Sequence, residues 1–215
     1  NTSLPPIGAS ATAAGGTAFD GTTEGVWVSN GVLTTLVHPD SCRELCAPQR
    51  ILPDRAIVTG LAVHEPSRQL LVTDNVQRIH IFKIECPLQR AVRVCSLAGT
   101  LPAGHTFGGI AIDDITGDIY FSSADFNSPQ SPGNLLWVSS LTSPCRPRCR
   151  MRVPNCGRIA LVPIHGVAFD GCDNTVWVTD GLRQVALKVN PSTCRITEDR
   201  CCPGGFVDPL AGLDR

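Results

Sequence analysis

Small and apolar residues recur along the chain in a fixed phrase: glycine, any residue, alanine, an apolar residue, then Asp or His. A large residue within an apolar run follows each phrase alanine at a constant distance of nine positions. The four pairs are Ala18 and Trp27, Ala62 and Leu71, Ala111 and Tyr120, and Ala168 and Trp177. Because loops change length more easily than paired strands, the constant distance predicts one β-hairpin built four times.

Two further extended segments follow each hairpin and complete a unit of four predicted strands. The fourth strands are expected after the loop that follows each third segment, for example at residues 50–52, 91–94 and 158–161. Turn formers separate the strands, and no segment shows a sustained helical period. The phrase alanines are 44, 49 and 57 residues apart, which is typical of a propeller blade.

The fold class that follows is all-β: a β-propeller of about four four-stranded blades in one domain, stapled by disulfides. The predicted blades span residues 16–59, 60–108, 109–165 and 166–205. Residues 1–15 are a tail or a closing or donated strand, and residues 206–215 suggest one further inner strand. Both ends are expected either to close the ring or to pair with a neighbouring molecule, because an unpaired edge accepts another strand.

Two segments resemble known propeller repeats. VTDNVQRIHIF at residues 72–82 is similar to the NHL repeat, and VWVTDG at residues 176–181 is similar to the blade phrase of SMP-30-like and YVTN propellers. The resemblance covers roughly residues 16–200. It implies the propeller architecture, usually with six or more blades, and says little about activity.

Composition narrows the classes of partner. Hydrophobic residues make up 42% of the chain and charged residues only 17%, with a formal net charge of -1. The scattered basic residues give no reason to expect nucleic acid. No apolar run approaches a membrane span, and no charged and apolar leader opens the sequence.

The eleven cysteines indicate an oxidising compartment, so we expect a secreted protein. One cysteine ends the third segment of each unit, and a second follows within a short loop. We expect the pairs Cys42–Cys46, Cys86–Cys95, Cys145–Cys149 and Cys194 with Cys201 or Cys202. Cys156 and Cys172 stay unassigned, and the odd total leaves a free thiol or a bridge to another chain. Zinc is disfavoured because the two C-x3-C pairs belong to different units.

Candidate chemistry is sparse, and no cofactor is expected. The phrase-ending residues Asp20, His64, Asp113 and Asp170 recur in every unit, which favours a turn role, as it does for Asn30, Asp74, Ser123 and Asp180. His105 and His165 break the repeat and are weak metal candidates at a channel mouth, an idea that depends on the resemblance to metal-using propellers. No nucleophile elbow, phosphate loop or paired-carboxylate motif occurs.

The favoured function is an extracellular, non-enzymatic propeller scaffold whose partners are proteins, above all copies of itself, assembled through the terminal segments into a surface or matrix fibre. One alternative is a carbohydrate-binding propeller with Trp27 and Trp177 as sugar platforms, although burial between blades suits both residues better. Another is a metal-dependent lyase or hydrolase. Asn1 begins an N-glycosylation sequon, so glycans are expected as attached sugar or ligand.

Overall fold

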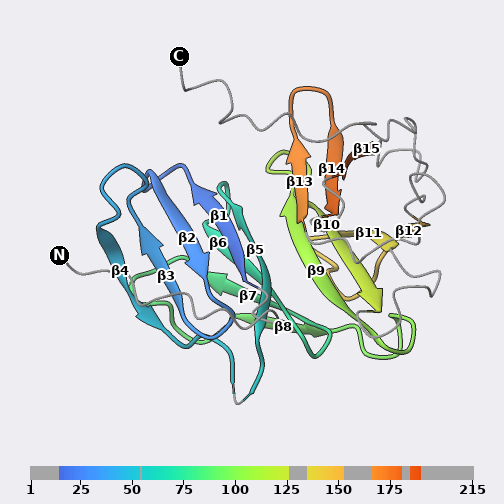
Figure 1. The fold of residues 1–215 in the computed structure, drawn as a ribbon, viewed down its shortest axis with the longest axis horizontal. Coiled ribbons are helices and arrows are strands. Elements are labelled where there is room, and N and C mark those ends of the chain that lie inside the picture. Colours follow the sequence, from blue (N-terminus) through green and yellow to red (C-terminus); the bar gives the residue numbers. More distant parts are fainter. Residues whose placement is uncertain (1–14, 54, 126–134, 153–165, 181–184, 190–215) are drawn as a thin grey trace. The chain divides into compact units, whose positions relative to one another are not determined.

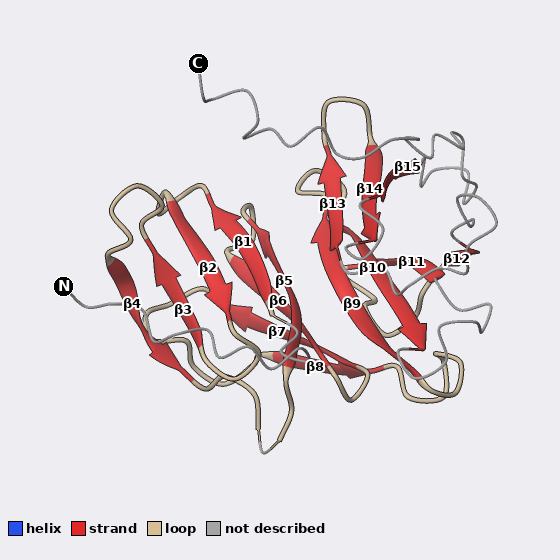
Figure 2. Ribbon diagram, viewed as in Figure 1, coloured by secondary structure: helices blue, strands red, loops and turns tan. Residues whose placement is uncertain are grey.

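A computed structural model describes residues 15–53, 55–125, 135–152, 166–180 and 185–189, and within these ranges all regular structure is β-strand (Figures 1 and 2). The strands are β1 (Gly16–Asp20), β2 (Gly25–Ser29), β3 (Thr34–Val37), β4 (Glu44–Gln49), β5 (Val58–His64), β6 (Gln69–Asp74), β7 (Arg78–Lys83), β8 (Arg93–Ser96), β9 (His105–Ile112), β10 (Asp118–Asp125), β11 (Leu135–Ser140), β12 (Cys149–Arg152), β13 (Gly166–Asp170), β14 (Thr175–Asp180) and β15 (Val185–Val189).

The strands form four antiparallel sheets in chain order, which confirms the predicted all-β blades. Blade 1 is β1-β2-β3-β4, blade 2 is β5-β6-β7-β8, blade 3 is β9-β10-β11-β12, and blade 4 is β13-β14-β15. Residues 190–205, which complete the predicted fourth blade, lie outside the described ranges. No helix of the described residues is long and apolar enough to cross a membrane.

The nine-residue spacing is a direct cross-strand pair in every blade. Ala18 faces Trp27 and Ala62 faces Leu71 in the registers of blades 1 and 2. The same pairing joins Ala111 to Tyr120 and Ala168 to Trp177. The predicted hairpin is therefore confirmed in all four blades, and the constant spacing fixes which face each side chain occupies.

The turn of each first hairpin also repeats. Four residues follow the phrase-ending Asp or His, and the last of them has a positive φ in every blade: 52° at Glu24, 50° at Arg68, 72° at Gly117 and 56° at Asn174. A left-handed residue at this point lets a short loop reverse the chain. Only blade 3 uses glycine there, although glycine is the least strained choice.

The fourth strands of blades 1 and 2 are shifted from the predicted positions in opposite directions. In blade 1 the strand was expected at residues 50–52 and runs earlier, from Glu44 to Gln49. In blade 2 it was expected at residues 91–94 and runs two residues later, from Arg93 to Ser96. In blade 3 the fourth strand is β12, Cys149–Arg152, and the predicted segment 158–161 lies outside the described residues. Cysteines that were placed in the loop before the strand, Cys46, Cys95 and Cys149, are therefore part of the strand itself.

The chain divides into two compact units, and each is described by itself. Unit 1, Asn1–Ser96, contains blades 1 and 2, and unit 2, Leu97–Arg215, contains blades 3 and 4. In unit 1, Trp27 and Leu36 of blade 1 share one core with Leu61, Leu70 and Phe82 of blade 2. A side chain at Gly16 would collide with the backbone of Gly60 and Leu61, so the small residue of the phrase permits the close approach of β1 to β5.

Unit 2 repeats this packing with different residues. Tyr120 and Val138 of blade 3 form a core with Val176 and Val178 of blade 4. The rings of Tyr120 and Phe169 stack with centroids 5.4 Å apart. In both units, the face of a blade that carries the phrase alanine and its large partner packs against the following blade.

Candidate functional site

The junction of blades 1 and 2 holds a charged network. The guanidinium of Arg68, in the β5–β6 turn, donates to both carboxylate oxygens of Asp20 at 2.6 and 3.0 Å. Arg68 also pairs with Glu65 at 2.8 Å, and Glu65 accepts hydrogen bonds from the Gly21 amide and the Thr22 hydroxyl. Two turns from different sheets are thereby joined by side chains.

The Asp20 side chain is fully buried, and its pKa reflects two opposed effects. Burial alone would raise the pKa, but the hydrogen bonds from Arg68 and Thr23 more than offset it, so the pKa of Asp20 lies below its ordinary value. The carboxylate therefore stays charged at neutral pH and is engaged by Arg68. This arrangement suits an ion pair that aligns two blades better than an acid or base for catalysis.

The other phrase-ending residues serve the turns that follow them, as predicted. Asp113 accepts from the Ile115 amide and the Thr116 hydroxyl, and Asp170 accepts from the Cys172 amide. The His64 ring lies 2.6 Å from the Ser67 hydroxyl. Asn30, ten residues beyond Asp20, accepts from the amides of Val32 and Leu33. These groups are occupied with local structure.

Asp74 extends the turn role into a buried cluster that the sequence did not reveal. Its carboxylate accepts from the amides of Val76 and Arg78, from the Arg78 guanidinium at 2.8 Å and from His80 Nε2 at 2.8 Å. Burial would raise the pKa of Asp74, but the hydrogen bonds from His80 and Arg78 outweigh it and lower the pKa. The signal available in sequence was the alternation that places Arg78 and His80 on the strand after the turn.

The metal candidate His105 is part of a buried hydrogen-bonded chain in blade 3. Its Nδ1 lies 3.1 Å from the hydroxyl of Ser123, and that hydroxyl accepts from the indole N–H of Trp137 at 2.8 Å. Burial lowers the pKa of His105, with partial opposition from Asp125. No group of three or more His, Cys, Asp or Glu that could hold a metal occurs among the described residues.

These contacts also correct the prediction for Ser123. Sequence equivalence with Asp74 suggested that Ser123 serves a turn, but Ser123 lies in β10 and links two buried side chains instead. The second metal candidate, His165, lies outside the described residues, as do Asn1, Cys156, Cys194, Cys201 and Cys202. Their roles remain the predictions made from sequence.

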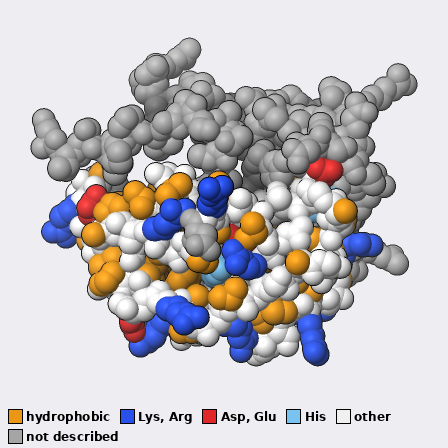
Figure 3. All heavy atoms as spheres, turned by 90° about the horizontal axis from the view of Figure 1, so that it is seen from below, with side chains coloured by type: hydrophobic (Ala, Val, Ile, Leu, Met, Phe, Trp, Pro, Cys, Tyr) orange, Lys and Arg blue, Asp and Glu red, His pale blue; other side chains and the backbone are white. Residues whose placement is uncertain are grey.

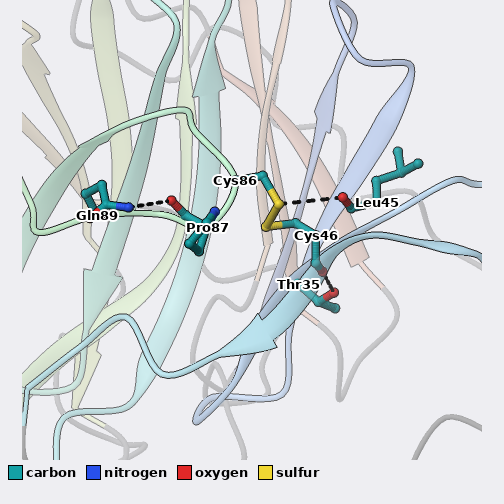
Figure 4. Close-up of a disulfide and its surroundings, with 6 residues drawn as sticks. All are labelled: Thr35, Leu45, Cys46, Cys86, Pro87 and Gln89. Atoms are coloured by element: carbon teal, nitrogen blue, oxygen red, sulfur yellow. Dashed lines mark hydrogen bonds between the residues drawn. A yellow bond between two sulfur atoms is a disulfide. The ribbon is translucent and has the colours of Figure 1, made fainter.

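A disulfide joins the two blades of unit 1. Cys46, within β4, is bonded to Cys86, which follows β7, with Cα atoms 5.6 Å apart (Figure 4). Cys86 Sγ also lies 3.6 Å from the carbonyl oxygen of Leu45, and Thr35 donates to the carbonyl oxygen of Cys46 at 2.6 Å. The predicted pairs Cys42–Cys46 and Cys86–Cys95 are therefore wrong, because both paired an outer-strand cysteine with its neighbour in the same blade.

The remaining described cysteines divide into two groups. Cys95, Cys145 and Cys149 are in disulfides, whereas Cys42 and Cys172 are free and exposed. The predicted pair Cys145–Cys149 stays a prediction. Sulfur bridges are thus a feature of both units, and in unit 1 the bridge spans two sheets instead of one hairpin.

The two tryptophans proposed as sugar platforms differ in environment. Trp27 is fully buried, which confirms its packing role, whereas Trp177 is 36% exposed, with Lys188 Nζ 5.3 Å from its ring centroid. The equivalent residues Leu71 and Tyr120 are buried. A sugar site repeated on these positions in each blade is therefore not supported.

Apolar side chains reach the surface at a few points. Figure 3 shows hydrophobic side chains interspersed with Lys and Arg on one face. The most exposed of the large hydrophobic residues are Ile115 at 88%, Val92 at 62% and Phe19 at 61%. Phe19 lies in β1, the edge strand of blade 1, and its exposed aromatic ring marks a candidate interaction surface.

No protein-family model matches the chain, and no curated protein matches it either. Among solved structures, the chain is similar to the β-propeller domain of Cps50 (Swd1) from Myceliophteria thermophila, with a TM-score of 0.55 and 11% sequence identity. The match covers 80% of this chain and 50% of that domain, so the chain spans about half the length of the structure it resembles. At this identity the similarity concerns the fold, and it supports a β-propeller.

Proposed function

We propose that this protein is an extracellular, non-enzymatic propeller scaffold that binds protein partners, including copies of itself. The observation that carries the proposal is the Cys46–Cys86 disulfide across two sheets, accompanied by oxidised Cys95, Cys145 and Cys149. Disulfides persist in oxidising compartments and are rare where glutathione keeps thiols reduced. We also propose, from the phrase at residues 72–82, that the blades are related to the NHL repeat.

The buried polar groups of the described residues support the non-enzymatic part of this proposal. Asp20, Asp74 and His105 have the features that mark active sites, namely burial and a shifted pKa. Each is engaged by protein partners at 2.6 to 3.1 Å. Side chains that are hydrogen-bonded in this way stabilise the fold. We therefore propose that the protein acts through its surfaces.

Secretion and oxidation test the proposal together. The chain is expressed once behind a secretion signal and once in a reducing cytosol, and free thiols are counted after denaturation. We expect the secreted form to be folded, with Cys46 and Cys86 linked, and to unfold at a lower temperature once reduced. A cytosolic form with every thiol reduced and the same unfolding temperature would contradict the extracellular assignment. Metal analysis of the secreted form checks the enzyme alternative, which predicts one tightly bound ion per chain.

A further inference from the structure

Charge is distributed unevenly along the sequence. Between Asp125 and Asp170 there are five arginines and no Asp, Glu or Lys, although the whole chain has 18 basic and 19 acidic residues. Four of the five arginines stand at alternate positions: Arg146, Arg148, Arg150 and Arg152. We call residues 146–152 the arginine run. An excess of one sign within one segment of a nearly neutral chain indicates an anionic partner for that segment.

The arginine run leads into the edge strand of blade 3. In the strand order β12-β11-β10-β9, β12 has a neighbour in its sheet on one side only. The Arg148 amide donates to the carbonyl oxygen of Val138 at 2.8 Å, and Arg150 pairs across the strands with Trp137. Arg146, Arg148 and Arg150 are all exposed. The backbone of the run is therefore held by β11 while three of its arginines reach solvent.

Trp137 positions the side chain of Arg150. The guanidinium carbon of Arg150 lies 5.6 Å from the centroid of the Trp137 ring, and Trp137 is only 4% exposed. A guanidinium above an aromatic ring is attracted by the electron-rich face of the ring. The indole is fixed in turn, because its N–H donates to the Ser123 hydroxyl at 2.8 Å. Arg150 is thus pre-organised, so less conformational entropy is lost when it binds an anion.

Arg148 offsets the nearby carboxylate of Asp118. Its guanidinium donates to both carboxylate oxygens at 2.7 and 2.5 Å, and the Arg148 side chain is still 52% exposed. Within the described part of the chain, Arg146 and Arg150 form no ion pair. Three arginines against one aspartate leave a net positive charge, and Arg146 and Arg150 carry it.

The arginines are arranged to bind a long ligand. Successive arginines of the run are two residues apart, and two residues of extended chain span about 6.6 Å. The guanidiniums therefore follow one another along the chain, whereas a single small anion is bound best by donors that converge on one point. Each guanidinium can hold an oxyanion with two parallel hydrogen bonds. A linear polyanion with repeated oxyanion groups fits this arrangement.

The surroundings of the run favour a glycan over other polyanions. Single-stranded nucleic acid is bound by bases that stack on exposed aromatic rings, but Trp137 is buried beneath Arg150. An anionic membrane is bound through exposed apolar side chains beside basic ones. None of the large exposed hydrophobic residues of the described chain lies within residues 135–150. A sulfated polysaccharide needs neither feature.

We propose that the arginine run binds a linear sulfated polysaccharide, with Arg146 and Arg150 as the principal sulfate contacts. The proposal rests on the extracellular scaffold function, since sulfated polysaccharides belong to cell surfaces and the extracellular matrix, and it names a ligand for that scaffold. The fourth strands of blades 1 and 2 have the sequences ELCAPQ and RVCS and lack the alternating arginines. The site thus belongs to blade 3 and does not repeat in blades 1 and 2.

Fluorescence anisotropy of labelled heparin, a sulfated polysaccharide, tests the site in the full chain at physiological salt. The double variant Arg146→Gln with Arg150→Gln should bind heparin about tenfold more weakly or worse. The matched control is Arg50→Gln with Arg55→Gln, which removes the same charge from two exposed arginines of blade 1. It should change the affinity by less than about threefold, because salt screens distant charges. No binding by the unaltered chain, or equal losses in both double variants, overturns the proposal.

Salt dependence separates lost contacts from a damaged fold. The slope of log affinity against log salt concentration should fall by about one for each arginine contact removed, and so by about two in the glutamine double variant. Arg146→Lys with Arg150→Lys keeps both charges and should retain most of this slope. Circular dichroism confirms that each variant is folded. An unchanged slope in the glutamine variant, or an equal loss of slope in the lysine variant, contradicts the proposal.

Competition by other polyanions tests the class of ligand. Desulfated heparin, which keeps its carboxylates, polyglutamate and single-stranded DNA should each compete about tenfold more weakly than heparin. Vesicles containing phosphatidylserine should compete weakly as well. Competition as strong as that of heparin by any of these overturns the assignment to a sulfated glycan. The scaffold function is tested apart from this result, since the Cys46–Cys86 bond of the secreted chain is measured without a ligand.

Discussion

Blades 1 and 2 are built from the same strand phrase but differ in how much of it is buried. All seven positions of β5 are buried, whereas in β1 only Asp20 is buried. Thr17 of blade 1 stands where blade 2 has Leu61, on the face that in blade 1 carries the exposed Phe19. The phrase therefore specifies the strand and its register, and the neighbouring blade determines which of its faces becomes core.

Replacing one residue on each face of blade 1 is the strongest test of this comparison. Trp27→Ala should lower the free energy of unfolding by about 3–5 kcal/mol, because it empties the core shared by the two blades. Phe19→Ala should lower it by less than about 1 kcal/mol, because that ring is largely in solvent. Urea denaturation at a concentration where the chain is monomeric measures both. Similar losses would mean that the two faces are equally buried.

Removal of the bridge between the blades should have the next largest effect. Cys46 and Cys86 are 40 residues apart, so on the chain-entropy account Cys86→Ser should cost about 3–4 kcal/mol. Cys42→Ser is the control and should leave the stability of the monomer unchanged, since that thiol is free and exposed. Thermal unfolding under oxidising conditions compares the two. A large loss from Cys42→Ser would indicate a different pairing in solution.

The charged junction should contribute less. Arg68→Ala should cost about 1–2 kcal/mol, because it leaves the buried Asp20 carboxylate without its guanidinium partner, although Arg68 itself is 30% exposed. Glu24→Ala changes the equivalent turn residue of blade 1 and should alter monomer stability by less than about 0.5 kcal/mol. Chemical denaturation of both variants, with Asp20→Asn as a further comparison, measures the difference. Equal losses of stability from Arg68→Ala and Glu24→Ala would show that the Arg68–Asp20 contact does not distinguish the two blades.

The smallest expected effect is a pH dependence from His105. Burial lowers its pKa from the ordinary 6.5, so the unfolded chain takes up a proton at a higher pH than the folded chain does. Stability should therefore fall as the pH drops below about 6.5, and fall again in the acid range, where Asp20 and Asp74 hold lowered pKa values. Denaturation midpoints across this range check the sign. His105→Gln should flatten the upper part of the curve, and an unchanged curve would contradict the assignment.

The hairpins were predictable from sequence because their information is local. The offset from Ala18 to Trp27 is set by two strands and a four-residue turn, and the structure pairs these residues directly. The turn role of Asp113 and Asp170 is local as well and is visible in the residue type. The predicted positions of the fourth strands in blades 1 and 3 were wrong because Cys46 and Cys149 were assigned to loops. Both cysteines lie within strands, and cysteine is compatible with a strand.

The disulfide and the buried clusters were not predictable in the same way. Cys46 is four residues from Cys42 and 40 from Cys86, and sequence proximity favoured the wrong partner. The contact between Arg68 and Asp20 likewise crosses from one blade to the next. Such links depend on how sheets pack, which a repeat pattern leaves undetermined. The chain from His105 through Ser123 to Trp137 was missed because its members come from three strands of one blade.

The left-handed turn position has a consequence for how a repetitive chain avoids misassembly. Near-identical sheets can stack in the wrong order during folding, a hazard typical of repeat proteins. At this position the backbone is the same in four blades while the side chain is Glu24, Arg68, Gly117 or Asn174. Arg68 finds a carboxylate on blade 1, and none of the other three side chains carries the positive charge to do so. The residue type at this one turn position thus distinguishes blade 2 from the other three sheets and favours its packing against blade 1.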